Sequence, residues 1–556
     1  MIATANGIIF KLTQGRRMDS VGESGQNQQE GRPSDARGVL RTYFGYDSFR
    51  SGQEEVISSV LSGRDALAVM PTGAGKSICY QIPAVLLGGL TIVVSPLISL
   101  MGDQVRSLKE AGIRGSYLNS TLTPRQQEVV MARAIAGWYD LMYVAPERLA
   151  DQRFLAFAQQ VRIPLVAVDE AHCVSQWGQD FRPAYRGIPD FVARLPRRPV
   201  VCALTATATA RVRQDVSRLL ELHDPLVQVN GFDRPNLRLS AFELTPKERT
   251  RWLLGYLAAH PTWSGIVYAT TRKKVDELAE ALREAGITAV SYHAGMDNEE
   301  RTASQDAFVC DEARVMIATN AFGMGIDKSD VRFVVNCGLP LSLEEYYQEA
   351  GRAGRDGEPA ECYLLWSRGD IRTCHFFIDN TMFPPEMTQA EKDGLLRNRE
   401  RLLSAMIGYA MSDSCLRARV LRYFGQDASS LVTANGSCGC GGCSVCLKTS
   451  ADEYLRAARP RRAFGATGAS GYRTRELPSE AEVTDEDERL FQRLRGVRKR
   501  LADEFRVPPY MVFSDATLRA MVRRRPSNEE ELLEVSGVGQ AKLRRYGDVF
   551  LEEINR

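Results

Sequence analysis

Short apolar segments alternate with longer stretches of helical periodicity through the first two thirds of this 556-residue chain. Such alternation indicates a parallel sheet, because a crossover helix must return the chain to the edge where the next parallel strand begins. The alternation occurs twice: the first run covers about residues 37–235, and the second follows it and ends near Trp366. The expected strands are 66–69, 90–94, 141–144, 165–168, 200–204, 265–268, 288–292, 315–318 and 333–335. The sequence therefore predicts two successive α/β domains.

Composition narrows the class of protein. Hydrophobic residues make up 44% of the chain and charged residues 25%, which is typical of globular domains. Lys and Arg number 71 against 69 Asp and Glu, so the net charge is only +2. A surface that binds a polyanion such as DNA must therefore be a local cluster of basic residues. The longest uncharged stretch, 77–102, contains Pro83, Gly88-Gly89 and Ser95-Pro96, which divide it into a short helix, a turn and a buried strand. We therefore expect no membrane span.

A glycine-rich loop, MPTGAGKS at residues 70–77, follows an apolar strand and precedes a helical stretch. This is the context of a phosphate-binding loop, in which glycines bring the backbone close to phosphate and the amides at the helix start face the anion. Met70 stands where the strict pattern has glycine, and a chance glycine turn is the alternative. The residues predicted to bind ATP and Mg²⁺ are Thr72, Gly73, Gly75, Lys76 and Ser77.

A second buried strand ends in a pair of acids, within VAVDEAH at residues 166–172. In such sheets the carboxyl ends of the strands form the ligand site. We expect Asp169 to hold Mg²⁺ and Glu170 to orient and deprotonate the attacking water. A solvated turn is the alternative for the acids alone. His172 either couples the site to the neighbouring domain or satisfies a local hydrogen bond.

The second α/β domain ends in a run that places Gln348, Arg352 and Arg355 three or four residues apart. This spacing predicts one shared helical face. An arginine directed at the γ-phosphate stabilises the charge of the transition state, so we interpret these residues as catalytic. A salt-bridged surface helix explains the charges but not the small Ala and Gly residues between the arginines.

With these motifs in order, residues 40–447 and 485–556 resemble the RecQ family of superfamily-two DNA helicases. The segment YDSFRSGQ at 46–53 is similar to the family's adenine-recognition motif. The resemblance implies that Tyr46 and Arg50 pack against the base and that Gln53 hydrogen-bonds its edge.

Further segments resemble the family's DNA-binding and coupling motifs, above all the aromatic-rich loop SQWGQDFR at 175–182. Two of its aromatic side chains would stack on bases, at roughly 1–3 kcal/mol each; the alternative is an aromatic pair buried under a loop. Gly325 resembles a residue that faces DNA backbone or nucleotide. The resemblance assigns DNA binding or coupling to Ser95, Trp177, Phe181, Arg182, Thr205, Thr207 and Thr319.

Twelve cysteines are too few for a disulfide scaffold in a chain of this length, yet the last of them are clustered. Two consecutive Cys-x2-Cys steps suit four-thiolate ligation of a structural Zn²⁺. An iron–sulfur cluster is the alternative. Cys438 is a fifth candidate that competes with Cys440. The resemblance to the family's zinc region assigns Cys415, Cys440, Cys443 and Cys446 as ligands.

The expected organisation is two tandem RecA-like parallel-sheet domains, a helical zinc-binding subdomain and a small all-α bundle that resembles the HRDC domain. Met18 is an alternative first residue of the protein. The bundle carries a stripe of basic residues around Arg498, which would bind DNA phosphates; a solvated helix face is the alternative. The predicted regions are a disordered leader 1–35, the RecA-like domains 36–234 and 235–368, the zinc-binding subdomain 369–447, a flexible basic linker 448–482 and the HRDC-like domain 483–556.

The linker is too short for the winged-helix domain that most RecQ helicases with an HRDC domain carry. Only 36 residues separate Cys446 from the HRDC-like segment, whereas a compact domain needs about 100. Few of these residues are apolar, so we expect a tether and weaker unwinding.

The resemblance implies an ATP-dependent DNA helicase that moves 3′-to-5′ on single-stranded DNA and separates strands in repair, recombination and replication. Its expected cofactors are ATP, Mg²⁺ and structural Zn²⁺. Its expected partners are single-stranded and forked DNA, with single-strand-binding protein and recombination factors, in the cytoplasm and with the nucleoid if the protein is bacterial. The alternatives are an RNA helicase and a scaffold that binds ATP without hydrolysing it.

Overall fold

The computed structural model describes residues 33–96, 98–178, 180–320, 322, 328–383, 387–431, 439–457, 485–505 and 507–556. The predicted leader lies almost wholly outside the described residues. Gly325 and Cys438 also lie outside them, as does most of the predicted linker, from residue 458 onward.

The first domain is a seven-stranded parallel sheet in the order β3-β4-β2-β5-β6-β1-β7. Its strands are β1 (Ala66–Val69), β2 (Thr91–Val94), β3 (Gly115–Leu118), β4 (Leu141–Val144), β5 (Leu165–Val168), β6 (Val200–Thr205) and β7 (Leu226–Val229). Its α-helices are α1 (Ala36–Val39), α2 (Gln53–Leu61), α3 (Ile78–Leu86), α4 (Ile98–Ala111), α5 (Pro124–Ile135), α6 (Gln152–Ala158), α7 (Ile188–Ala193) and α8 (Ala210–Leu219). Shorter turns of helix are η1 (Leu40–Phe44), η2 (Pro146–Ala150), η3 (Ala171–Val174) and η4 (Pro183–Gly187).

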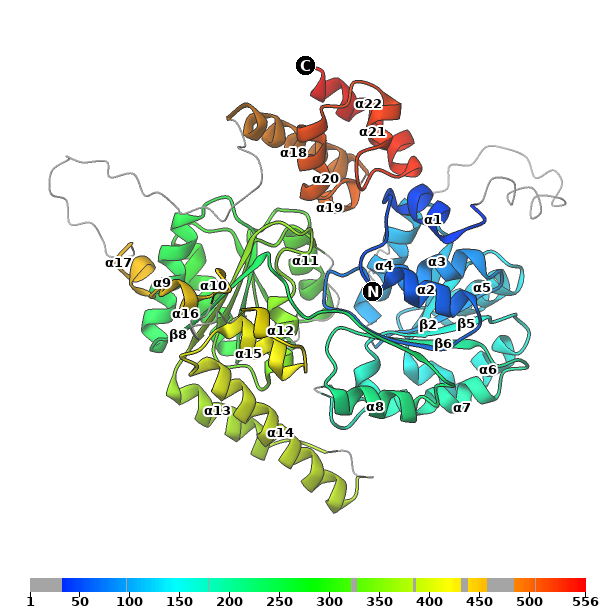
Figure 1. The fold of residues 1–556 in the computed structure, drawn as a ribbon, viewed down its shortest axis with the longest axis horizontal. Helices are drawn as coiled ribbons and strands as arrows, with labels where there is room; N and C mark the ends of the chain where they lie inside the picture. Colours follow the sequence, from blue (N-terminus) through cyan, green and yellow to red (C-terminus); the bar gives the residue numbers. More distant parts are fainter. Residues whose placement is uncertain are drawn as a thin grey trace, which may run out of the picture.

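The second domain is a six-stranded parallel sheet in the order β10-β11-β9-β12-β13-β8. Its strands are β8 (Leu237–Glu243), β9 (Gly265–Ala269), β10 (Ala289–Tyr292), β11 (Val315–Ala318), β12 (Phe333–Cys337) and β13 (Ala360–Trp366). Its helices are α9 (Pro246–Ala259), α10 (Arg272–Glu284), α11 (Asn298–Val309) and α12 (Leu343–Ala350). The two sheets stand side by side with helices on both faces (Figure 1).

The prediction of two RecA-like parallel sheets is confirmed, and the central strands β1, β2, β4 and β5 are buried along their whole length. Burial on both faces is why these strands are continuous apolar runs. Four strands, β3, β7, β8 and β13, were not predicted from the sequence. Residues of β7 alternate between half-buried and exposed, so this edge strand has no apolar run.

Several helix starts are specified locally by N-caps. Thr123 and Thr245 each form a capping box with the residue three positions later, and each is followed by a proline in the first turn. The threonine hydroxyl accepts an otherwise unpaired backbone N–H, and the proline has no N–H to satisfy. The helices α5 and α9 therefore begin where the sequence places these pairs.

A helical region follows the second sheet and ends in the cysteine-rich segment. The long pair α13 and α14 extends away from the sheet (Figure 1). The helices are α13 (Arg368–Asp379), α14 (Gln389–Ala410), α15 (Leu416–Tyr423), η5 (Ser429–Leu431), α16 (Ser444–Leu447) and α17 (Asp452–Ala457).

Helix α17 corrects the predicted start of the linker at residue 448. It packs on α9, where the Tyr454 ring lies 5.2 Å from the rings of both Trp252 and Tyr256. The aromatic contact holds this segment on the second domain, so the chain up to residue 457 belongs to that domain rather than to a tether.

The C-terminal module, residues 485–505 and 507–556, is a separate helical bundle with its own core. Its helices are α18 (Asp485–Phe505), α19 (Pro509–Val512), α20 (Asp515–Arg524), α21 (Glu529–Leu533) and α22 (Gln540–Ile554). Arg498 is 1% exposed, so it cannot belong to a phosphate-tracking surface stripe. Across the described part of the chain, none of the helices has both the length and the apolar character that a membrane span requires.

Candidate nucleotide and metal sites

The glycine-rich loop connects β1 to α3 at the carboxyl edge of the first sheet. Gly73 and Gly75 have φ values of +84° and +77°, which disfavour any residue with a Cβ atom. Lys76 Nζ donates to the Met70 carbonyl at 3.3 Å. Burial lowers the pKa of this ammonium, while the carboxylates of Glu170 and Asp169 raise it. The loop therefore presents a half-buried cation beside two half-buried acids.

Two residues of the predicted adenine motif hold this loop in place. Gln53 Nε2 donates to the carbonyls of Ala74 and Gly75 at 2.9 and 3.1 Å, and its Oε1 accepts from the Arg50 backbone N–H at 2.9 Å. The Arg50 guanidinium also donates to the Gly73 carbonyl. Gln53 is only 2% exposed, whereas Tyr46 is half-exposed. Contact of these residues with a base stays a prediction.

The acid pair follows β5 and faces the loop. Burial raises the pKa of Asp169 to about 7; the Glu170 charge adds to this shift and Lys76 opposes it. Asp169 Oδ1 accepts from the Glu170 backbone N–H at 3.0 Å. Glu170 itself has a φ of 48°, a conformation that residues with a side chain rarely adopt outside sites that need it. A divalent cation would relieve the crowding of negative charge, so the residues fit Mg²⁺.

His172 lies between the acid pair and the end of β6. His172 Nδ1 lies 3.4 Å from Glu170 Oε2 and 2.8 Å from Thr205 Oγ1. Thr205 Oγ1 in turn donates to the Thr207 carbonyl at 3.2 Å. Burial lowers the pKa of His172. His172 is thus hydrogen-bonded to the 205–207 segment and lies beside Glu170, whose Oε2 has no hydrogen-bond partner within the described residues. The coupling role of His172 stays a prediction.

The two arginines predicted to be catalytic do not share one helical face with Gln348, which corrects the sequence expectation. Helix α12 ends at Ala350, and Arg352 and Arg355 lie in the turns that follow it. These arginines and Gln348 nevertheless line the same cavity of about 440 Å³ as Lys76 and Glu170. A Cβ placed on Gly73 would lie 3.4 Å from Arg355 Cα, so this turn approaches the phosphate loop closely.

Arg352 is 4% exposed, and its Nε has no hydrogen-bond partner in the described part of the chain. A buried, incompletely paired guanidinium is unfavourable unless a ligand completes its contacts. The cavity therefore combines a lysine and two acids from the first domain with arginines from the second.

Arg234 is a site residue that the sequence analysis missed. It lies between the two sheets and donates to the carbonyls of Thr72, Ala353 and Gly354 at 2.6, 3.0 and 2.8 Å. One guanidinium therefore ties the phosphate loop to the turn that carries the arginines. No sequence motif marks Arg234 as a site residue. Only its position in the connection between the two domains pointed to such a role.

In the aromatic-rich loop, an arginine covers each aromatic ring. The guanidinium carbon of Arg211 lies 3.2 Å from the Trp177 ring centroid, and that of Arg186 lies 5.0 Å from the Phe181 centroid. Both rings are half-buried, and neither arginine was identified from sequence. The pairing places a cation beside each predicted base-stacking ring.

Arg182 ties this loop to the segment after β2. It pairs with Asp180 at 3.1 Å and donates to the Pro96 carbonyl at 3.0 Å. Ser95 directly follows β2 and Thr319 directly follows β11, so both predicted DNA contacts lie at carboxyl ends of parallel strands. The loop and both strand ends thus occupy the edges where such sheets bind ligands.

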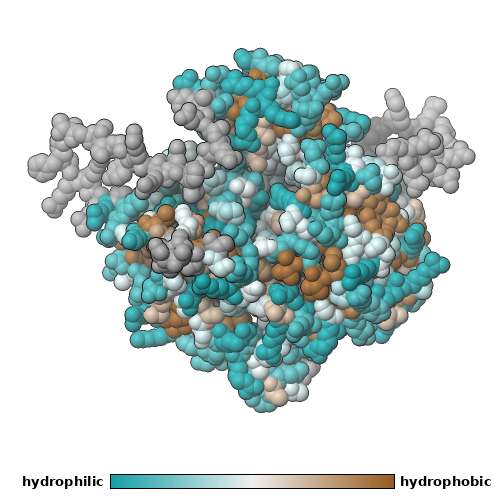
Figure 2. Space-filling view, in the orientation of Figure 1, coloured by the Kyte–Doolittle hydropathy of each residue, from teal (hydrophilic) through white to brown (hydrophobic). Residues whose placement is uncertain are grey.

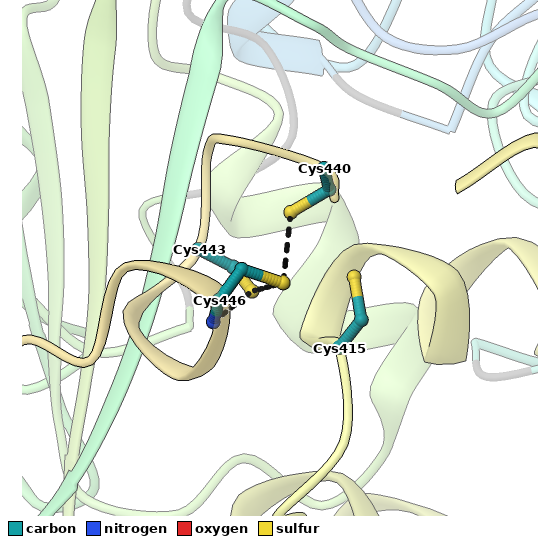
Figure 3. Close-up of side chains that lie close together, drawn as sticks. All are labelled: Cys415, Cys440, Cys443 and Cys446. Carbon is teal, nitrogen blue, oxygen red and sulfur yellow. Dashed lines mark hydrogen bonds between the residues drawn. The ribbon is translucent and has the colours of Figure 1, made fainter. Parts of the chain in front are cut away.

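Four cysteines converge in the helical region (Figure 3). The potential ligand atoms of Cys415, Cys440, Cys443 and Cys446 all lie within 4.8 Å of one another. Cys446 Sγ is 3.5 Å from Cys440 Sγ and 3.3 Å from Cys443 Sγ. A tetrahedral ion with Zn–S distances of about 2.3 Å separates its sulfurs by about 3.8 Å, so the cluster fits zinc. Within the described residues these four cysteines are the ligand set, and Cys438 lies outside them.

Helix starts orient two of the thiols. Cys415 and Cys443 are the N-caps of α15 and α16, and their sulfurs accept from the backbone N–H groups of Ala418 and Cys446 at 3.4 Å. Hydrogen bonds from Cys415 and Cys440 also hold the pKa of the Cys443 thiol below its usual range. Both effects favour the thiolate form that binds metal.

The cysteine cluster is attached to the edge of the second sheet. Leu239 of β8 donates its backbone N–H to the Gly442 carbonyl at 3.0 Å. Arg417 of α15 binds Asp233 and the Leu237 carbonyl, each at 2.6 Å. The cluster thus covers the exposed edge of β8 and holds the connection that contains Arg234.

This fold is that of a two-domain helicase motor, with residues from both sheets at one cavity. Protein-family models match the same domains. The matching models are DEAD/DEAH box helicase over residues 50–216, Helicase conserved C-terminal domain over 248–357, RecQ zinc-binding over 368–447 and HRDC domain over 487–554.

Curated relatives extend this match along most of the chain. The ATP-dependent DNA helicase RecQ of Bacillus subtilis (strain 168) is 38% identical, and the alignment covers 93% of this chain and 98% of that protein. The protein of the same name from Pasteurella multocida (strain Pm70) is 36% identical, with 93% of each covered. The chain therefore belongs to the RecQ family of helicases.

Solved structures show the same motor fold at low identity. A DEAD-box helicase bound to single-stranded RNA is 16% identical with a TM-score of 0.53, covering 71% of this chain and 90% of that one. The helicase MrfA bound to DNA is 17% identical with a TM-score of 0.50, covering 71% and 59%. Together, the zinc-binding match and the four-cysteine cluster support a structural zinc.

Proposed function

We propose that this chain is an ATP-dependent DNA helicase that moves 3′-to-5′ on single-stranded DNA. The observation that carries the proposal is the cavity lined by Lys76 and Glu170 from one domain and by Arg352 and Arg355 from the other. Hydrolysis in such a cavity depends on the approach of the two domains, so a nucleotide cycle can alternately close and open them. The RecQ relatives, which are named as ATP-dependent DNA helicases, support this assignment.

In the proposed reaction Lys76 binds the β- and γ-phosphates and Glu170 orients and deprotonates the attacking water. Mg²⁺ held through Ser77 and Asp169 would neutralise charge on the phosphates. Arg352 and Arg355, with Gln348, would stabilise the charge that develops on the γ-phosphate. Tyr46, Arg50 and Gln53 would select adenine, and Arg50 and Gln53 also hold the loop as observed.

DNA occupancy would reach this site through His172, which lies beside Glu170 and is hydrogen-bonded to Thr205. Trp177 and Phe181 are proposed to stack on bases once their covering arginines turn to phosphates. Ser95 and Thr319 would contact the strand at the two sheet edges, and Arg182 would transmit loop movement to Pro96.

Single-stranded and forked DNA are the proposed substrates, in repair, recombination and replication. Single-strand-binding protein and recombination factors are proposed partners from the family assignment alone. We place the enzyme in the cytoplasm, and with the nucleoid in a bacterium.

We also propose that a winged-helix domain is missing between the zinc-binding match, which ends at 447, and the HRDC match, which begins at 487. The Bacillus subtilis relative aligns over 599 positions, more than the 556 residues of this chain, so the alignment includes positions that this chain lacks. Without a duplex-binding wing, unwinding should be weak and should favour short or forked duplexes.

Strand displacement on 3′-tailed, 5′-tailed and forked DNA, with ATPase measured alongside, tests this function. We expect displacement of the 3′-tailed and forked duplexes only, and its loss in Lys76→Ala and Glu170→Gln. Glu170→Gln should still bind nucleotide, because the lost group acts on water rather than on phosphate. ATPase stimulated by RNA and not by DNA would instead identify an RNA helicase. Efficient unwinding of long blunt duplexes would contradict the missing wing.

A further inference from the structure

The C-terminal module is docked on the motor. The Gly537 backbone N–H donates to the Gly45 carbonyl at 2.8 Å. Glu110 of α4 pairs with Arg545 of α22 and accepts from Tyr546 Oη at 3.2 Å. The module lies above the junction of the two domains (Figure 1) and is seated against the rest of the molecule in the space-filling view (Figure 2). These contacts join it to the first domain.

The contact is close enough to require glycine at position 45 and to leave little room for a side chain at position 539. A Cβ on Gly45, where φ is +70°, would lie 2.4 Å from the backbone carbon of Val538. A Cβ on Gly539 would lie 3.2 Å from the carbonyl oxygens of Thr42 and Tyr43. Backbone therefore packs directly on backbone, which requires a specific fit between η1 and the turn before α22.

The module also contacts the second domain. The buried Arg498 donates to Asp515 Oδ1 at 2.8 Å and to the Phe513 carbonyl at 3.0 Å. Its other terminal nitrogen lies 3.7 Å from Asp330 Oδ2. Asp330 follows the second domain's β11 and also pairs with Lys328 at 3.2 Å. One module thus contacts both halves of the motor.

This docking places the module at the nucleotide cavity. Helix η1 leads directly into the adenine motif, and the cavity of about 440 Å³ that contains Tyr46 and Lys76 is completed by side chains of the module. The module residues that line it are Tyr510, Met511, Ser514, Thr517, Gly537 and Lys542.

Lys542 is the charged residue among these six. Within the described residues its ammonium has no hydrogen bond or ion pair, and its nearest recorded partner is the Phe513 ring, 5.7 Å away. Burial lowers the pKa of Lys542 to about 8, and the Glu110 charge opposes this shift. A desolvated ammonium in a cavity that contains a phosphate loop is suited to an anionic ligand.

We propose that the docked C-terminal module completes the nucleotide site, with Lys542 donating to an oxygen of a bound nucleoside diphosphate or triphosphate. The proposal rests on the function proposed above. Docking then raises nucleotide affinity, and by linkage bound nucleotide favours the docked module. The module is in this respect part of the ATP-binding machinery.

Titration of the full chain with a fluorescent ADP analogue tests the contact. Lys542→Ala should weaken binding roughly three- to tenfold, the range expected for loss of one charge-assisted hydrogen bond. Lys542→Arg should retain most of the affinity. Lys499→Ala, a matched change at an exposed lysine of the same module, should have no effect. Unchanged affinity in Lys542→Ala would overturn the contact. A loss of single-stranded DNA binding without a loss of ADP binding would overturn it too, by assigning the lysine to DNA phosphate.

Charge reversal tests the docking separately. Glu110→Arg and Arg545→Glu should each weaken ADP binding severalfold, and the double variant should restore it because the ion pair is rebuilt in reverse. Thermal melting of each variant would establish that it folds. If single and double variants bind alike, the linkage is wrong. Lys76→Ala separates a failure of the module's contact with nucleotide from a failure of the ATP site itself. If Lys76→Ala abolishes ADP binding while all module variants bind ADP normally, only the module's role is wrong. If Lys76→Ala binds ADP normally, the proposed ATP site is wrong.

Discussion

The first and second domains are built on sheets of the same kind, but corresponding strands end in different chemistry. Counted from the β3 and β10 edges, β1 and β8 are both the sixth strands, and β5 and β12 are both the fourth. β1 leads into a glycine-rich phosphate loop, whereas β8 leads into the Thr245–Pro246 cap of α9. β5 ends in Asp169 and Glu170, whereas β12 is followed by Gly338.

The fold therefore fixes where a site can form, at the carboxyl ends of the strands, but the residues that follow each strand decide the chemistry of that site. The second domain lacks a phosphate loop within its described residues and contributes through the turn after α12 instead. Because that turn contacts the first domain's loop through Arg234, neither domain holds a complete site alone.

Removing the second domain's arginines should have the largest effect. Arg352→Ala and Arg355→Ala should each lower kcat about a thousandfold or more, because a guanidinium stabilises transition-state charge. Steady-state ATPase with saturating single-stranded DNA measures this. Arg368→Ala, an exposed arginine of the same part of the chain, is the control. A decrease of less than about tenfold would mean that the first domain hydrolyses ATP without help.

Metal removal should destabilise the second domain selectively. Cys443→Ser should lose the metal and lower the free energy of unfolding by about 3–5 kcal/mol, because structural zinc contributes directly to folding. Elemental analysis should find one zinc per chain in the unaltered protein, and thermal melting should report the loss of stability. Cys310→Ser, outside the cluster, should retain zinc. Iron with sulfide, or no metal, would refute the assignment.

Weakening the link between the domains should have an intermediate effect. Arg234→Lys should lower kcat by roughly ten- to a hundredfold, because one ammonium cannot replace a planar guanidinium that binds carbonyls of both domains. Nucleotide affinity should change less than kcat, since the phosphate loop itself is intact. Equal losses in kcat and in ADP affinity would indicate that Arg234 shapes the loop rather than joining the domains.

The smallest effect should come from the aromatic-rich loop of the first domain, which is proposed to sense DNA. Trp177→Ala should leave basal ATPase intact and reduce its stimulation by single-stranded DNA about three- to tenfold, through loss of stacking. Trp138→Ala is a matched control, because Trp138 is exposed and also carries an arginine over its ring. A proportional decrease of basal and stimulated rates would indicate damage to the fold instead.

Much of the motor was predictable because its signals are local. Buried parallel strands are apolar runs, so β1, β4 and β5 could be placed to within a residue. The phosphate loop and the cysteine spacing are also short motifs, and the four cysteines assigned by resemblance do converge. Edge strand β7 was missed because partial exposure removes the apolar pattern on which strand prediction depends.

Only the tertiary structure shows which contacts join the two domains and the C-terminal module. Residue spacing suggested that Gln348, Arg352 and Arg355 share a helix, but α12 ends at Ala350 and the turn packs on the other domain. The roles of Arg234 and Lys542 depend on partners more than a hundred residues away in sequence. The sequence by itself determined the buried central strands, the glycine-rich loop and the paired Cys-x2-Cys steps, because short-range periodicity and spacing encode them. The joining of two domains and a terminal module at one cavity depends on packing between distant surfaces, which no local pattern records.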